Sequence, residues 1–231
     1  MILKNMICVA GFCLITLSGQ AAGKPEVPPY KDKTVSIEKR VDDLMGRMTL
    51  REKVLQLQNR GAGRLDEIDR IFNGESYGCT HEMGTTAAEC AAMYKELQQY
   101  MLTKTRLGIP IITSAEGIQG ILQNNCTLFP HALAQGSTFN PALIQRMTEA
   151  AGEEAKVIGI HQILSPVLDI ARELRWGRVE ETFGEDPYLI SEMGIAFING
   201  YQKKPHHLYA EAFCCARHSF RRIELCAGQR W

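Results

Sequence analysis

The chain has 231 residues, a formal net charge of zero and 45% hydrophobic residues, so its size allows one large domain or two small ones. With 23% charged residues, the composition is that of an ordinary globular protein. Because no basic stripe stands out, the charge pattern indicates neither a nucleic-acid partner nor binding to an acidic membrane surface.

The first residues have the pattern of a secretory signal. Lys4 provides a positive start, and residues 6–17 form an apolar run that is too short to span a bilayer comfortably. Small residues follow, and cleavage after Ala21 or Ala22 is expected. We therefore expect residues 1–22 to be removed from an exported protein, secreted or periplasmic, with no stable membrane association. An uncleaved membrane anchor is the alternative.

Helices and strands then alternate along the chain, as judged from the spacing of apolar residues and from capping signals. Strands separated by helices indicate βα units and a parallel sheet. The predicted elements are helices over 36–48 and from Thr49, a short strand within a loop at 77–80, a helix over 86–103, a strand at 107–113, a helix over 140–159, a strand at 163–170 and a helix from Asp186.

Few cysteines remain for a disulfide framework. Cys79, Cys90 and Cys126 lie between the signal and the last segment, and their number is odd. Their spacing does not match that of a metal site. We expect buried thiols, which are common in globular proteins.

Polar residues directly follow two predicted strands, where parallel α/β folds carry their active face. Glu116 lies after the first strand, in the segment 114–120 with two glycines. Its carboxylate can accept hydrogen bonds from sugar hydroxyls, and the glycines allow the backbone to approach a ligand. A solvated glutamate in a capped turn is an equally weighted alternative.

The second polar segment, residues 169–187, gathers arginines and glutamates around Trp176. An arginine can donate a fork of hydrogen bonds to hydroxyls or to a carboxylate. Trp176 offers either a stacking face or buried packing. Arg172, Glu180 and Glu181 are most simply interpreted as structural ion pairs that brace the loop.

At these residues the sequence resembles the N-terminal domain of glycoside hydrolase family 3. The matching segments are RVDDLMGRMTLREKVLQL, LGIPIITSAEGIQG, LFPHALAQGSTFNPALI and SPVLDIARELRWGRVEETFGEDPYL. The resemblance implies an α/β fold, with residues 23–203 forming the first half of a (β/α)8 TIM-type barrel. It also implies a β-glucosidase-like hydrolase that acts with retention of configuration and requires neither a metal nor an organic cofactor.

The resemblance implies roles for three residues in binding a β-linked oligosaccharide or glycoside. Glu116 corresponds to an acidic group that binds sugar hydroxyls, Arg178 to a substrate-contacting arginine, and Arg175 supports it. Many members have Asp in place of Glu116 and His in place of Gln119, so the preferred sugar stays open between glucosides, xylosides and other β-glycosides. The nucleophile and the acid/base lie on later segments, so no residue of this chain is predicted to be catalytic.

The segment 204–231 shows no helix or strand period. It begins after Lys203, and one back-translation, read one base later, gives the Lys-His-Phe motif of the family. We therefore expect a frameshifted tail and a truncated chain without glycosidase activity. The alternatives are a non-catalytic sugar-binding fragment and a single-domain β-N-acetylhexosaminidase of the same family.

Overall fold

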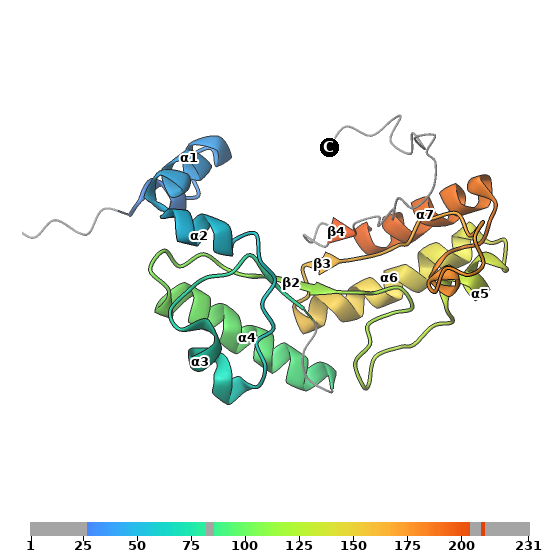
Figure 1. Cartoon of the computed structure of the whole chain (residues 1–231), viewed down its shortest axis with the longest axis horizontal. Coiled ribbons are helices and arrows are strands. Elements are labelled where there is room, and N and C mark those ends of the chain that lie inside the picture. Colours follow the sequence, from blue (N-terminus) through green and yellow to red (C-terminus); the bar gives the residue numbers. More distant parts are fainter. Residues whose placement is uncertain (1–26, 82–85, 204–208, 211–231) are drawn as a thin grey trace, which may run out of the picture. The chain divides into compact units, whose positions relative to one another are not determined.

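The computed structural model describes residues 27–81, 86–203 and 209–210 (Figure 1). The predicted signal at 1–22, and all of the predicted tail except residues 209–210, lie outside these residues. The chain divides into two compact units, Met1–Arg47 and Met48–Trp231.

The first unit contains a 3-10 helix, η1 (Pro29–Lys31), and the helix α1 (Ile37–Arg47). The backbone N–H of Tyr30 donates to Asp43 of α1 at 3.1 Å, which ties the two elements together. The predicted helix over 36–48 is confirmed. None of its residues is buried, because a single 3-10 turn within this unit cannot cover an apolar helix face.

The second unit is an α/β structure. Its four short strands pair in parallel, and their order in the sheet is the order along the chain, β1-β2-β3-β4. The elements are α2 (Leu50–Leu55), η2 (Leu65–Glu67), α3 (Ile68–Phe72), β1 (Cys79–Thr80), α4 (Ala87–Lys104), β2 (Ile112–Ala115), α5 (Ala132–Gly136), α6 (Pro141–Ile158), β3 (Gln162–Ile163), η3 (Val179–Glu181), α7 (Pro187–Gln202) and β4 (Tyr209–Ala210).

The long helices begin where their capping residues predict. Thr86 and Glu89 form a reciprocal capping box at the start of α4. The Asn140 side chain accepts a backbone hydrogen bond at the start of α6, and Asp186 does the same for α7, each followed by a proline. These ends are therefore confirmed, because each depends on contacts within one helical turn.

The strands differ from the prediction. β2 lies later than the predicted strand at 107–113, because its pairing with β3 runs through Ser114 and Ala115. Pro110 has no N–H to donate to a neighbouring strand. β3 is much shorter than the predicted strand at 163–170, and Pro166 falls within the part that does not pair.

Three helices provide most of the core. α6 and α7 lie side by side (Figure 1), and α4 contacts α6. The apolar face of α4 is buried, and α7 also buries one side, with Leu189 half-buried. The core residues contributed by these helices include Cys90, Tyr94, Leu97 and Met101 of α4, Ile144, Ala151, Ala155 and Ile158 of α6, and Met193, Phe197 and Tyr201 of α7.

The cysteines between the predicted signal and the tail were predicted to be buried thiols. Cys90 is buried and Cys79 and Cys126 are half-buried, and all three are thiols. Burial raises the pKa of the Cys79 thiol.

Within the described ranges, none of the helices combines the length and the apolar character that crossing a bilayer requires.

Candidate functional site

The candidate site lies at the carboxyl ends of three neighbouring parallel strands. His81 directly follows β1 and Glu116 directly follows β2, while the long connection from residue 164 to η3 follows β3. Since parallel strands end at one edge of a sheet, these segments share that edge. The sheet therefore places the two predicted polar loops on the same side.

Glu116 is paired with a histidine from the neighbouring strand. Its Oε1 lies 3.3 Å from Nε2 of His81. The other ring nitrogen of His81 lies 3.2 Å from the Ser114 hydroxyl, which in turn donates to the carbonyl of Thr80 at 2.8 Å. The Glu116 side chain is still 44% exposed, so its carboxylate is held and yet accessible to a ligand.

The backbone after Glu116 is fixed by a residue of α7. The Tyr201 hydroxyl donates to the carbonyl of Gly117 at 2.7 Å in a buried setting. Gly117 has φ +67°, and a Cβ there would lie 2.6 Å from Cγ2 of Ile163. Only glycine combines this left-handed backbone with such close packing. The loop that carries the carboxylate is therefore rigidly attached to the core.

The predicted arginines are each engaged by a nearby glutamate. Nε of Arg178 donates to both carboxylate oxygens of Glu181, at 2.9 and 3.0 Å. Arg175 donates two side-chain hydrogen bonds to Glu173, at 2.8 and 2.7 Å, and this contact raises the pKa of Arg175. The pairing of Glu181 agrees with its interpretation as a brace for the loop.

The two arginines differ in how firmly they are placed. Arg178 lies against the 3-10 turn η3 and its side chain is 37% exposed, whereas the side chain of Arg175 is 89% exposed. Trp176, between them, is half-buried. Arg178 is therefore the better-placed donor for a bound ligand, and Arg175 is free of packing constraints.

Metal binding is not supported by the residues that the structure describes. No three His, Cys, Asp or Glu side chains within residues 27–81 and 86–203 gather in a way that could hold an ion. What the edge offers is carboxylate acceptors and guanidinium donors, which suit a polyhydroxylated ligand.

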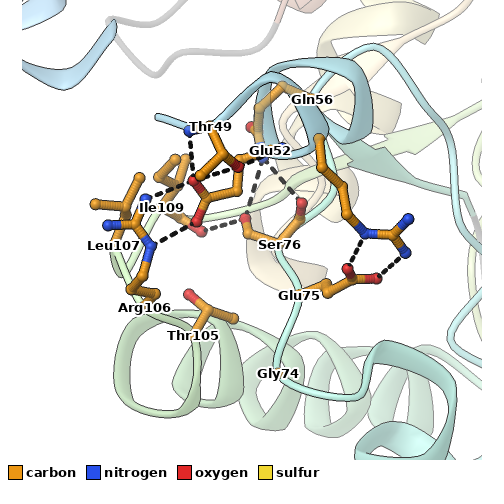
Figure 2. A pocket seen from close by; sticks show the side chains of 11 residues that line it. Thr49, Glu52, Gln56, Gly74, Glu75, Ser76, Thr105, Arg106, Leu107 and Ile109 are labelled. Atoms are coloured by element: carbon orange, nitrogen blue, oxygen red, sulfur yellow. Dashed lines mark hydrogen bonds and ion pairs between the residues drawn. The ribbon is translucent and has the colours of Figure 1, made fainter. Parts of the chain in front are cut away.

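A second polar cluster lies at the opposite ends of the strands. A pocket of about 220 Å³ is lined by residues that precede β1 and β2, such as Ser76 and Ile109, and by residues of α2 (Figure 2). Glu52 accepts from Arg106 at 2.9 Å there. The hydrogen bond from Arg106 is the main reason that the pKa of Glu52 falls to about 2.

The charges of this pocket are already matched within the protein. Arg51 donates to Glu75, and Gln56 donates to the carbonyl and the hydroxyl of Ser76. A ligand would have to break these pairs to gain contacts of its own. We therefore interpret the cluster as a brace between α2 and the turns before the strands (Figure 2).

Two residues of the site were not predicted. His81 had the signal that identified Glu116, because it is the first residue after a strand, yet the strand was too short to be defined firmly. Tyr201 belongs to the last predicted helix, and nothing in its local sequence indicated a role in the site. Its hydroxyl contact with Gly117 spans 84 residues of sequence, and local patterns carry no such information.

The fold and the site define an α/β protein with polar loops at the carboxyl edge of a parallel sheet. Residues 49–218 match the model of the glycosyl hydrolase family 3 N terminal domain. The chain therefore belongs to glycosyl hydrolase family 3, as its sequence motifs predicted. The matched range begins within the second unit and continues past Lys203.

Known relatives give the same assignment. A putative β-xylosidase of Formosa agariphila is 34% identical over 188 residues, which cover 75% of this chain and 25% of the relative. A periplasmic β-glucosidase/β-xylosidase of Dickeya chrysanthemi is 29% identical over 80% of this chain and 31% of its own length. The chain thus spans between a quarter and a third of these relatives.

Solved structures resemble the fold as well. A crystal structure of a mutant β-glucosidase from Listeria innocua in complex with laminaribiose has a TM-score of 0.60 and is 32% identical. The match covers 73% of this chain and 24% of the Listeria protein. The similarity therefore concerns one part of a longer enzyme.

Proposed function

We propose that this chain provides part of the sugar-binding surface of an exported β-glycosidase that hydrolyses O-glycosyl bonds with retention of configuration. The observation that carries the proposal is Glu116, an accessible carboxylate held at the carboxyl edge of β2 in a family 3 domain. Relatives named as β-glucosidases and β-xylosidases support this class of substrate, a β-linked oligosaccharide or glycoside.

In this proposal, Glu116 accepts hydrogen bonds from the hydroxyls of the sugar in the first subsite. Arg178 donates to the substrate from the loop after β3, and Arg175 supports it. Binding of hydroxyls orients the sugar, and contacts that strengthen in the transition state accelerate the chemical step. Arg178 contacts the sugar in this proposal either while it stays paired with Glu181 or after it exchanges this carboxylate for the sugar.

The chemistry itself requires two carboxyl groups, one that attacks the anomeric carbon and one that protonates the leaving oxygen. We assign neither role to a residue of this chain. We therefore propose that the 231 residues by themselves do not hydrolyse glycosides. The reaction as proposed requires no metal and no organic cofactor.

The proposed architecture is the first part of a (β/α)8 barrel. The order of β1, β2 and β3, which precede the predicted tail, supports it, because each strand of such a barrel pairs with the next strand along the chain. We also propose export to the periplasm or beyond, directed by residues 1–22. The periplasmic relative of Dickeya supports this location.

Two alternatives have different consequences. A non-catalytic sugar-binding fragment would bind glycosides as a folded, soluble chain and would have no hydrolytic role. A β-N-acetylhexosaminidase of the same family would prefer N-acetylated sugars. The likeness to a solved family 3 β-N-acetylglucosaminidase from Paenibacillus, 22% identical, supports the fold alone and not this substrate.

Chromogenic aryl β-glucosides and β-xylosides test the proposed function. Two proteins are compared, the 231-residue chain and the product obtained when one base restores the reading frame at the codons of Lys203 and Lys204. We expect turnover, with the β-anomer as the first product, from the second protein alone. Absence of turnover from the frame-restored product, or preference for N-acetylglucosaminides, would contradict the proposal. Resequencing the genomic DNA at these codons establishes which product the organism makes.

A further inference from the structure

His81 has the geometry of a residue that orients Glu116. The two residues come from the ends of neighbouring strands, β1 and β2, and their side chains are 37% and 44% exposed. Nε2 of His81 faces the carboxylate, while Nδ1 faces the hydroxyl of Ser114. The imidazole therefore bridges the candidate sugar-binding carboxylate and a buried residue of β2.

The hydroxyl of Ser114 determines which ring nitrogen carries a proton. A serine hydroxyl has one proton, and Ser114 donates it to the carbonyl of Thr80, which can only accept. The Ser114 oxygen can then only accept from His81, so Nδ1 has to be the N–H. If the ring is neutral, Nε2 presents a lone pair to the Glu116 carboxylate, and two acceptors repel each other.

A doubly protonated imidazole removes this conflict. Nδ1–H then donates to the hydroxyl of Ser114. The protonated Nε2 of the positively charged ring lies 3.3 Å from Oε1 of Glu116, which is within ion-pair distance. Since Ser114 is 1% exposed and lies within β2, the anchor of the ring does not move. The strand therefore fixes the direction from which the cation approaches the carboxylate.

We propose that His81, as an imidazolium anchored by Ser114, is a positioning residue that holds the Glu116 carboxylate in the orientation that accepts the sugar hydroxyls. This inference rests on the proposed role of Glu116. It adds a residue and a protonation state to the subsite. The ion pair between His81 and Glu116 is partly exposed. Removing the His81 side chain should therefore raise the dissociation constant for the sugar by up to about fivefold, which corresponds to the upper range for exposed ion pairs.

The first test needs no sugar. Ring ¹⁵N chemical shifts of His81 are compared at one mildly acidic pH in wild type, Glu116→Gln and Ser114→Ala. We expect an Nδ1–H in wild type, a changed Nε2 shift in Glu116→Gln, which lacks the charged carboxylate facing this nitrogen, and loss of the fixed Nδ1–H form in Ser114→Ala. Identical His81 spectra in wild type and Glu116→Gln would overturn the proposal.

The second test measures the dissociation constant for methyl β-D-glucopyranoside and methyl β-D-xylopyranoside by NMR titration of the whole chain. His81→Leu removes the donor, and His81→Gln restores a neutral N–H donor to Glu116. His161→Leu is the matched control, because this histidine directly precedes β3 and contacts Thr113 of β2. Circular dichroism of each variant verifies that the fold is kept.

We expect weaker binding in His81→Leu, partial recovery in His81→Gln and no change in His161→Leu. Equal affinity of wild type and His81→Leu would overturn the positioning role while leaving the proposed function intact. Absence of saturable binding in wild type, with the His81 ring signature present, would overturn the proposed sugar subsite and this inference with it. The two failures are therefore distinguishable.

Discussion

The pair of Glu52 and Arg106 offers a quantitative test of the structure through pH. Substitution Glu52→Gln removes the charge and keeps an acceptor for the backbone N–H of Thr49, because glutamine also serves in a capping box. The change therefore isolates the ion pair from the helix cap. We expect the variant to be less stable than wild type at neutral pH.

The magnitude follows from the shift in the carboxyl group. The hydrogen bond from Arg106 is the largest of several causes that lower the pKa of Glu52 from 4.5 to about 2. The whole shift converts to about 3 kcal/mol, which is an upper bound for the ion pair. The side chains of Arg106 and Glu52 are 55% and 24% exposed, so solvent screens the pair. We expect a loss of about 1–2 kcal/mol.

The sign of the pH dependence is fixed by the direction of the shift. The folded pKa lies below the unfolded value, so the pair stabilises the fold fully above about pH 4.5 and loses this contribution as the pH falls toward about 2. The difference between wild type and Glu52→Gln should therefore be largest at neutral pH and shrink in acid.

Urea unfolding followed by circular dichroism, at neutral pH and near pH 3, measures this difference. Glu96→Gln, an exposed glutamate on α4, is the matched control and should be neutral at both pH values. A Glu52→Gln effect that is equal at the two pH values would contradict a lowered pKa of Glu52 in the folded protein.

Three further predictions concern packing and caps, and urea unfolding measures each. Gly200→Ala would place a Cβ 1.8 Å from Oγ1 of Thr148 and should reduce the free energy of unfolding by about 2–3 kcal/mol, because the α6–α7 contact has no room for it. A loss no larger than that of an alanine substitution at an exposed helix position would contradict the close approach of α6 and α7 at this glycine. Tyr201→Phe leaves the carbonyl of Gly117 without its buried donor and should cost about 1–2 kcal/mol; a neutral result would show that the contact contributes nothing. Asn140→Ala removes the cap of α6 and should cost about 1 kcal/mol, whereas Asn140→Asp should be nearly neutral.

Local signals predicted the helices well. The capping box at Thr86 and the Asn140-Pro141 start depend on residues within one turn, so sequence spacing contains the needed information. The short helices α3 and α5 were missed, because five residues are too few to show a helical period. Strand limits were less accurate, since they depend on pairing between segments that lie far apart in the sequence.

The site was predicted only in part. The strand-end rule and the family motifs predicted Glu116 and Arg178 as site residues, and the backbone positions of both follow from the chain order. The contact between His81 and Glu116 joins the ends of two strands, and the support of Gly117 by Tyr201 joins a loop to a distant helix. Such contacts arise from the folded arrangement and leave no periodic trace in the sequence.

The binding of a sugar by the Glu116 carboxylate is tested by an NMR titration of the ¹⁵N-labelled chain with methyl β-D-glucopyranoside. Wild type, Glu116→Ala and the control Glu38→Ala, an exposed glutamate of α1, are compared. We expect saturable shifts at residues after β2 and β3 in wild type and control, and their loss in Glu116→Ala. Saturable binding that is unchanged in Glu116→Ala would contradict the claim that this carboxylate binds the sugar.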